Sequence, residues 1–331
     1  MRNVRWSSCF VVSAVLASGG ALLHENGTGR GSVHGAPSSY PTIIDDQRGP
    51  DVPVQGAMGL ISAGAAAAYA TGAGVHVAVL DGGFDLRHQF LSGHLGGQWD
   101  ALDQDPYAQD LGNLVDDDND NATDANVGHG TFVAGLIIAC APNAVVHPIR
   151  VLDDEGHGSP AALARGIDRA VELGAKVVNM SLVATDMTPQ LESSIQAAVD
   201  AGVILVSSAG NDPAGAFDAP FLRDRSITVG AVNGNLAVAG FSPNQALVDV
   251  FAPGVDVLGP LGGATLNVYA TWSGTSFASA FVSAAAALVK EHHPAMGFVA
   301  MRNRLAAATD PVSGATPSDR GSIDLLEAVQ D

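Results

Sequence analysis

The sequence predicts an α/β fold of three layers, α/β/α, in which helices cover both faces of a mostly parallel central sheet. Short apolar runs alternate with segments of helical period along the chain, and glycines stand at the ends of many of these runs. Glycine has no Cβ and fits where a strand turns abruptly into a helix. Strands and helices that alternate in this order require parallel strands joined by right-handed crossovers.

The first half of the predicted domain alternates regularly. Apolar runs that end at turn residues predict strands, and longer segments with helical periodicity predict helices. The acidic stretch at 100–127 interrupts this order as a long loop. We expect helices at 59–70, 129–139, 160–173 and 189–201, and strands at 75–80, 144–151, 176–181 and 203–207.

The second half begins with strands and ends with helices. We expect strands at 226–232, 247–251 and 268–271, an Ala-rich helix from 276 to about 291 and a short terminal helix at 323–330. The run FASAFVSAAAALV within the Ala-rich helix is too short to cross a bilayer. It therefore predicts a helix buried in the core.

The composition suits one large domain, or two small ones, with a core packed by Ala and Val. Of the 331 residues, 47% are apolar and only 5% aromatic. The formal net charge of −19 repels nucleic-acid phosphates and anionic membrane surfaces, so we expect neither as a partner. Solubility is the simplest interpretation of this acidity.

The N-terminus has the organisation of a secretory signal. Arg2 and Arg5 precede an apolar stretch from Cys9 to Leu23. A membrane span needs about 20 apolar residues, so an uncleaved anchor is the less favoured alternative. We expect a secreted or otherwise exported protein with a signal peptide at 1–23, a linker or short pro-segment at 24–52 and the folded domain at 53–331.

The cysteines exclude an internal disulfide in the mature chain. Cys9 lies in the expected leader, which leaves Cys140 alone. Cys140 ends the apolar run LIIAC, so we expect a buried small apolar residue rather than a nucleophile. Stability then comes from packing or from bound ions.

Two segments carry side chains suited to proton transfer. The strand VHVAVL ends directly at Asp81, and open α/β sheets have their active sites at the carboxyl ends of their strands. The segment GHGTFVAG places His129 between two glycines at the start of an apolar helix. Taken singly, Asp81 also fits a turn or a helix cap, and His129 a structural position.

Two further segments supply a nucleophile and a donor. WSGTSFASA sets Ser276 at the start of the Ala-rich helix, where unpaired N–H groups favour negative charge, although a plain helix cap is the alternative. VSSAGND ends a strand with Asn211, whose amide is a neutral donor able to point into a cleft. An acyl-transfer serine needs an adjacent base and donors for the oxyanion.

Together and in this order, the four segments resemble those of the subtilisin-like serine proteases, the subtilases of peptidase family S8. The order is informative because unrelated folds with the same triad place Asp, His and Ser differently along the chain. The likeness extends over roughly 53–331 and includes VLDDEGHGS, KVVNMSL, VDVFAPGVDV and RGSIDLLEAV.

The resemblance implies a serine endopeptidase of subtilisin-like fold that acts on polypeptides. His129 would be the base for Ser276, Asp81 would orient it, and Asn211 with the Ser276 N–H would hold the oxyanion. The substrate would lie as an added strand between two edges. The implied substrate-binding residues are Gly156, His157 and Gly158 on one edge, Ser181, Leu182 and Val183 on the other, and Ser208, Ala209 and Gly210 in the pocket for the residue before the scissile bond.

The sequence departs from the family near these residues. Gly82 stands where the family usually has Thr or Ser, and the loss of that hydroxyl would lower activity. Val183 stands where the family usually has Gly and would narrow the pocket near the cleavage site. Phe277 replaces the usual Met after the nucleophile, and the segment before the domain is shorter than the pro-domain that secreted members commonly have.

We expect no required cofactor, with calcium at the acidic loop as a weak alternative. Asn121 and Val127 stand where an EF-hand loop needs Gly and a bidentate Glu. The main alternative function is a catalytically weak binding or scaffold protein on the same fold. A nucleotide-binding protein is disfavoured because Gly72 and Gly74 precede their strand. The sequence does not indicate an oligomeric state.

Overall fold

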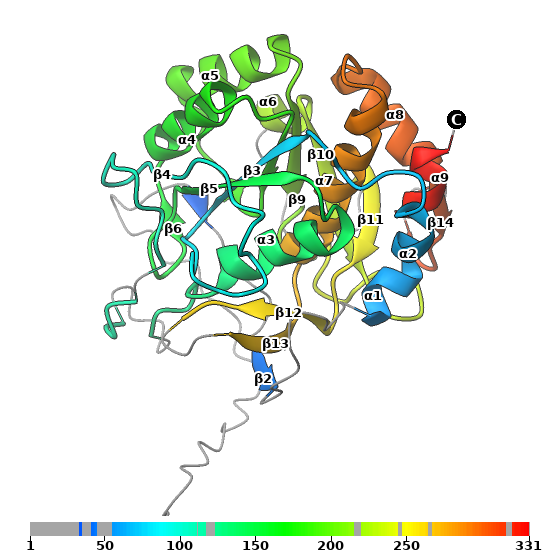
Figure 1. The fold of residues 1–331 in the computed structure, drawn as a ribbon, viewed down its shortest axis with the longest axis horizontal. Helices are drawn as coiled ribbons and strands as arrows, with labels where there is room; N and C mark the ends of the chain where they lie inside the picture. Colours follow the sequence, from blue (N-terminus) through cyan, green and yellow to red (C-terminus); the bar gives the residue numbers. More distant parts are fainter. Residues whose placement is uncertain are drawn as a thin grey trace, which may run out of the picture. The chain divides into compact units, whose positions relative to one another are not determined.

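A nine-stranded sheet runs through the described part of the chain and is parallel except at one edge (Figure 1). Its strands are β3 (His76–Asp81), β4 (Trp99–Asp100), β5 (Val145–Arg150), β7 (Val177–Met180), β9 (Ile204–Ser208), β10 (Ser226–Val232), β11 (Val250–Pro253), β14 (Thr309–Pro311) and β15 (Gly321–Ile323). They follow the order β14-β15-β11-β10-β9-β7-β3-β5-β4, and β14 is antiparallel to β15. The predicted mostly parallel sheet is confirmed.

The structure is a computed structural model. It describes residues 33–34, 41–44, 55–110, 112–116, 123–214, 220–243, 247–263, 267–315 and 320–330. The expected signal peptide, most of the 24–52 segment and residues 117–122 of the acidic loop lie outside these ranges. Among the helices described, none is long and apolar enough to cross a membrane.

Helices cover both faces of the sheet, as predicted (Figure 1). One face carries α3 (His129–Cys140) and α7 (Thr275–His292), and the other carries α4 (Pro160–Glu172) and α5 (Pro189–Asp200). The side chains of β3 alternate between them: Val77 and Val79 pack with α3 and α7, while Ala78 and Leu80 pack with α4 and α5. Such strands are apolar throughout because both of their faces are buried.

Smaller elements surround this core. They are α6 (Pro220–Arg223), α8 (Phe298–Ala307), α9 (Leu325–Val329) and the hairpin of β12 (Val257–Leu261) and β13 (Val268–Trp272). Two short strands come from the N-terminal part of the chain. β1 (Val33–His34) lies between β6 (His157–Gly158) and β8 (Val183–Ala184), and β2 (Thr42–Ile44) pairs with β13.

The helix predicted at 59–70 is wrong. The chain forms two short helices instead, α1 (Gln55–Leu60) and α2 (Ala63–Ala66), because Ser62 takes a left-handed conformation with φ 54°. Tertiary hydrogen bonds hold this break. The Ser62 hydroxyl donates to the Asp324 carboxylate at 2.6 Å, and Leu325 N–H donates to the Ile61 carbonyl at 2.9 Å.

Two other predicted elements are displaced. The strand expected at 247–251 begins only at Val250, because the Asp249 carboxylate accepts hydrogen bonds from Thr228 N–H and from Arg302. The terminal helix begins at Leu325, since the residues before it form β15. The sequence analysis also missed α8 and β12. Pro260 argued against a strand at this position, but β12 tolerates proline because it is an edge strand of its sheet.

Candidate active site

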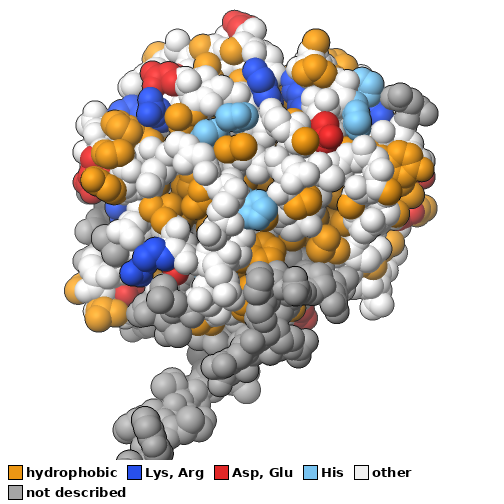
Figure 2. Space-filling view, in the orientation of Figure 1, with side chains coloured by type: hydrophobic (Ala, Val, Ile, Leu, Met, Phe, Trp, Pro, Cys, Tyr) orange, Lys and Arg blue, Asp and Glu red, His pale blue; other side chains and the backbone are white. Residues whose placement is uncertain are grey.

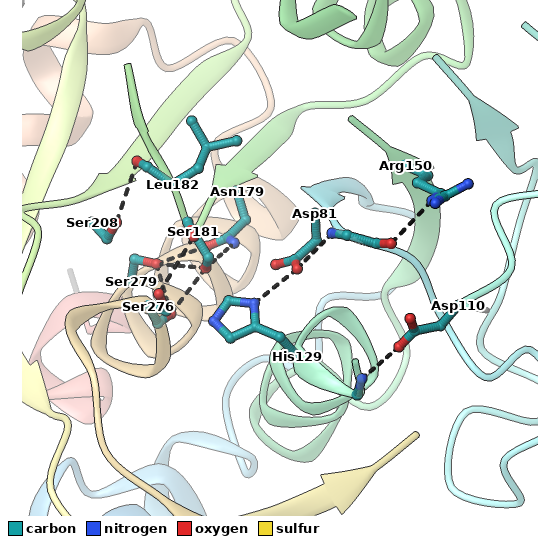
Figure 3. A network of polar contacts seen from close by, with 12 residues as sticks. Asp81, Asp110, His129, Arg150, Asn179, Ser181, Leu182, Ser208, Ser276 and Ser279 are labelled. Carbon is teal, nitrogen blue, oxygen red and sulfur yellow. Dashed lines mark hydrogen bonds and ion pairs between the residues drawn. The ribbon is translucent and has the colours of Figure 1, made fainter. Parts of the chain in front are cut away.

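The end of β3 and the start of α3 bring Asp81 and His129 together. His129 Nδ1 lies 2.8 Å from Asp81 Oδ1, and both side chains are fully buried (Figure 3). Gly82 N–H donates to the same carboxylate oxygen at 2.8 Å. Gly130 permits this approach, because a Cβ there would stand 2.3 Å from the Gly83 carbonyl oxygen. The predicted pairing of these two segments therefore has a close-packed geometric basis.

The imidazole of His129 lies between Asp81 and Ser276 (Figure 3). Its Nε2 is buried and has no hydrogen-bond partner. Aromatic rings enclose it: Trp272 meets it edge-on at 5.6 Å between centroids, and Phe277 lies 5.5 Å away. An apolar enclosure of this kind fixes the ring orientation and excludes water from it.

Ser276 lies in the first turn of α7, as predicted. Its hydroxyl donates to the Ser181 carbonyl at 3.4 Å rather than to His129. Catalytic hydrogen bonds are often long or misaligned in free enzymes and tighten when substrate binds. The 3.4 Å contact is weak, so rotation of the hydroxyl about χ1 towards Nε2 costs little.

Asn211 is fixed beside the same turn. Its Oδ1 accepts from the Thr275 N–H at 2.9 Å and from the Thr275 hydroxyl at 3.0 Å. These bonds orient the amide so that Nδ2 lies beside Gly274, 3.6 Å from where a Cβ would stand. A donor group is thereby held next to the first turn of α7, which contains Ser276.

A buried polar network that sequence reasoning missed anchors this turn to β7. The Ser276 carbonyl accepts from the hydroxyls of Ser181 at 3.0 Å and Ser279 at 2.8 Å (Figure 3). Asn179 completes the network by donating to Ser181 and accepting from Ser279 and Ser283. The available signal was a row of serines three and four residues apart on an otherwise apolar helix.

The two predicted substrate edges lie on β6 and β8, and the short strand β1 lies between them. β1 is antiparallel to both, with His34 opposite His157 on β6 and Val183 on β8. Val33 is fully buried in the same apolar cluster as Leu182. An extended segment can therefore add to both edges at once, as the sequence analysis expected of a substrate.

Of the pocket residues, Ser208 ends β9, and Ala209 and Gly210 follow it directly. Ser208 donates from its hydroxyl to the Leu182 carbonyl at 3.4 Å, which joins the two walls. Val183 Cγ2 reaches to 3.4 Å from where a Cβ on Gly210 would stand. The valine side chain thus points towards Gly210, and the expected narrowing of the pocket stays a prediction.

Asp110 is a second carboxylate at this site, and the sequence analysis gave it no role beyond its place in the long acidic loop at 100–127. Its Oδ2 accepts from Gly128 N–H, at the start of α3, while its Oδ1 is enclosed without a partner. Burial raises the pKa of Asp110 to about 7, and the nearby Asp81 carboxylate adds to the shift. Asp110 therefore titrates close to neutral pH.

The calcium alternative at the acidic loop stays a prediction, because residues 117–122 of that loop lie outside the described ranges. Groups of three or more His, Cys, Asp or Glu side chains that could hold a metal ion are absent from the described residues. The carboxylates bordering the acidic loop are turned to backbone amides: Asp124 accepts from Asn113 and Leu114, and Glu155 from Asp124 and Ala125.

Cys140 is buried, and burial raises the pKa of its thiol to about 12, as suits an inert apolar residue.

Comparison with known proteins decides the family. The peptidase S8 model, described as the subtilase family, matches residues 72–321. The chain belongs to the subtilase family. Two subtilases similar to it are an alkaline protease from Alkalihalobacillus alcalophilus, 36% identical over 71% of this chain, and subtilisin Savinase from Lederbergia lenta, 35% identical over 71%. The match spans 59% of the length of the first and 83% of the second.

Solved subtilase structures confirm the subtilisin-like fold. A protease from Pseudoalteromonas arctica aligns with a TM-score of 0.71 at 27% identity, covering 81% of this chain and 93% of that one. A cold adapted subtilisin-like serine proteinase aligns with a TM-score of 0.63 at 27% identity, covering 79% and 91%.

Proposed function

We propose that this subtilase is an exported serine endopeptidase that hydrolyses polypeptides through an acyl-enzyme on Ser276. The buried pair of Asp81 and His129, 2.8 Å apart, carries the proposal, because it leaves Nε2 of the imidazole without a partner on the side of Ser276 (Figure 3). A base with one nitrogen held and the other available can take a proton from a serine hydroxyl. Export is supported by the signal organisation of residues 1–23.

The reaction proceeds in two halves. His129 Nε2 takes the proton of Ser276 as the hydroxyl oxygen attacks the peptide carbonyl carbon, and Asp81 stabilises the resulting imidazolium. The imidazolium then gives this proton to the leaving amine as the C–N bond breaks. Water, deprotonated by His129, attacks the acyl-enzyme and releases Ser276 with its proton restored.

Asn211 and the Ser276 N–H hold the oxyanion that develops during each half. The two bonds from Thr275 to Asn211 Oδ1 orient the amide, and its donor group Nδ2 lies beside Gly274 at the start of α7. The Ser276 N–H belongs to the first turn of α7, where backbone donors have no partner within the helix. Donors fixed in advance at such a position stabilise the transition state without reorganisation.

Substrate and β1 compete for the same two edges. Both need the backbone groups of β6 and β8, and a substrate side chain would take the buried place of Val33. We therefore assign β1 to a pro-segment and propose that β1 leaves the two edges before a polypeptide binds. Release of this segment is a step separate from the chemistry at Ser276.

The test is casein hydrolysis by purified wild type and by Ser276→Ala, with Ser92→Ala as the matched control. Ser92 is exposed and lies outside the site. We expect hydrolysis by wild type and Ser92→Ala and a loss of at least about 10³-fold in Ser276→Ala. A folded wild type without hydrolysis would contradict the proposal and favour the binding or scaffold alternative.

A further inference from the structure

The space beside Asp81 that the family fills from the next residue is filled here from another segment. Subtilases usually have Thr or Ser after the aspartate, and this chain has Gly82. A Cβ on Gly82 would lie 1.9 Å from Asn126 Nδ2 and 3.1 Å from its Cγ. No two such atoms can coexist at 1.9 Å, so the Asn126 amide occupies the volume of the missing side chain.

The backbone of Asn126 fixes this placement. Its N–H donates to the Asp154 carbonyl at 2.8 Å, and its carbonyl accepts from His129 N–H at 3.1 Å. The residue is 1% exposed. Asn126 is thus locked one turn before His129, and the position of its amide follows from the start of α3.

Unpaired polar atoms stand on both sides of Gly82. Asp81 Oδ1 already accepts from His129 and from Gly82 N–H, whereas Asp81 Oδ2 is buried without a partner. Nδ2 and Oδ1 of Asn126 are also buried without partners. Buried polar groups are nearly always paired in native proteins, and an unpaired one is costly. A donor and an acceptor that both lack a partner, with only a glycine between them, are suited to each other.

We propose that Asn126 is the positioning residue for Asp81, with its Nδ2 supplying the donor that the family takes from the hydroxyl after the aspartate. The inference rests on the proposed function, because it assumes that Asp81 orients His129. It predicts that the loss of the hydroxyl at position 82 does not by itself lower activity, contrary to the expectation from the sequence. Gly82 and Asn126 are a matched pair: the glycine makes room, and the amide replaces the lost hydrogen bond.

The pairing is tested by a double-mutant cycle on peptide hydrolysis. In Asn126→Ala we expect kcat to fall about 10- to 100-fold, the range for a hydrogen bond to a charged group, with KM unchanged because the Asn126 amide lies against Gly82 rather than on β6 or β8. In Gly82→Ser we expect a loss as well, since the new side chain collides with Asn126. In the double variant Gly82→Ser/Asn126→Ala, which has the usual family arrangement, kcat should recover to within a few-fold of wild type.

Controls separate positioning from packing. Asn126→Asp keeps the volume but replaces the NH₂ donor with an acceptor, so it should lose as much kcat as Asn126→Ala. Asn143→Ala removes an exposed asparagine that donates only to Thr71, and it should match wild type. Melting temperatures of all variants show whether each is folded under the assay conditions.

The outcomes also separate this inference from the proposed function. If folded wild type hydrolyses peptides and folded Asn126→Asp keeps its kcat, the inference is wrong while the proposed function stands. A double variant no more active than Asn126→Ala would overturn it equally. If wild type itself were inactive, the proposed function would fail first.

Discussion

The two ends of the Asp–His–Ser array are held in contrasting ways. At the nucleophile end, Ser276 is anchored by neutral groups whose hydrogen bonds are all made: Asn179, Ser181, Ser279 and Ser283. At the acid end, the groups are two carboxyls and an amide, and several of their buried atoms have no hydrogen-bond partner. These atoms are Asp81 Oδ2, Asp110 Oδ1 and both amide atoms of Asn126.

This difference predicts a rigid geometry at the nucleophile end and a pH-dependent charge at the acid end. A satisfied neutral network fixes geometry and does not change with pH near neutrality. Burial holds the Asp110 carboxyl close to its protonation point, with a pKa of about 7, and the nearby Asp81 carboxylate adds to the shift. We therefore expect substitutions at the acid end to affect charge and catalysis, and substitutions at the nucleophile end to affect geometry, stability and substrate choice.

Asp81→Asn should produce the largest effect. The change keeps the shape but favours the wrong imidazole tautomer, so kcat should fall about 10⁴-fold. Asp103→Asn is the control, because its carboxylate is 74% exposed. Peptide hydrolysis measures kcat, and melting curves show whether each variant is folded. A loss of less than tenfold in Asp81→Asn would show that the acid end does not act on His129.

Asn179→Ala breaks the nucleophile end. It removes three buried hydrogen bonds and leaves the Ser283 hydroxyl without its acceptor, whereas the Ser279 hydroxyl keeps its bond to the Ser276 carbonyl. We expect the free energy of unfolding to fall by roughly 2–3 kcal/mol, with a drop in kcat. Ser283→Ala, which removes one bond, should cost only about 1 kcal/mol in urea unfolding. Equal stability of Asn179→Ala and wild type would contradict the account of this network.

Val183→Gly tests substrate choice at the nucleophile end. Removal of the valine side chain, which reaches the Gly210 wall, should open the pocket for large residues before the scissile bond. The ratio of kcat/KM for a Phe peptide to that for an Ala peptide should rise about tenfold, as expected for added apolar volume. An unchanged ratio would mean that Val183 does not face the bound side chain.

Asp110→Asn gives the smallest effect, and its sign is specific. Because its folded pKa lies above the ordinary value, Asp110 favours folding at low pH and loses that contribution as pH rises through about 7. Wild type should therefore lose roughly 1 kcal/mol of stability from pH 6 to pH 8 that Asp110→Asn retains. Thermal unfolding at both pH values measures this. If wild type instead lost stability relative to Asp110→Asn as the pH fell from 8 to 6, the raised pKa of Asp110 would be contradicted.

Much of the fold could be predicted because the core strands carry strong local signals. β3, β5, β7 and β9 are mainly apolar runs bounded by turn residues, and α7 is rich in Ala and buried from Thr275 to Lys290. The bounds of elements that depend on hydrogen bonds to residues far away in sequence were predicted wrongly. The break at Ser62 depends on Asp324, and the start of β11 depends on Arg302, neither of which is near in sequence.

The candidate site followed the same rule. Asp81, His129, Asn211 and Ser276 stand in recognisable segments, so the resemblance named them, and the structure brings them together. Asn126, Asn179 and Asp110 act through contacts with residues on other elements, and no local pattern marks them. Supporting groups of this kind become visible only when burial and unpaired atoms are known.

The measurement that tests the central claim most directly is labelling with a fluorophosphonate probe, followed by mapping of the modified residue by mass spectrometry. The probe reacts with a serine only where a neighbouring base activates it. We predict that wild type is modified at Ser276 alone and that Ser276→Ala and His129→Ala, both folded, are not modified. Labelling of another serine, or labelling of His129→Ala at the wild-type rate, would contradict the claim that His129 activates Ser276.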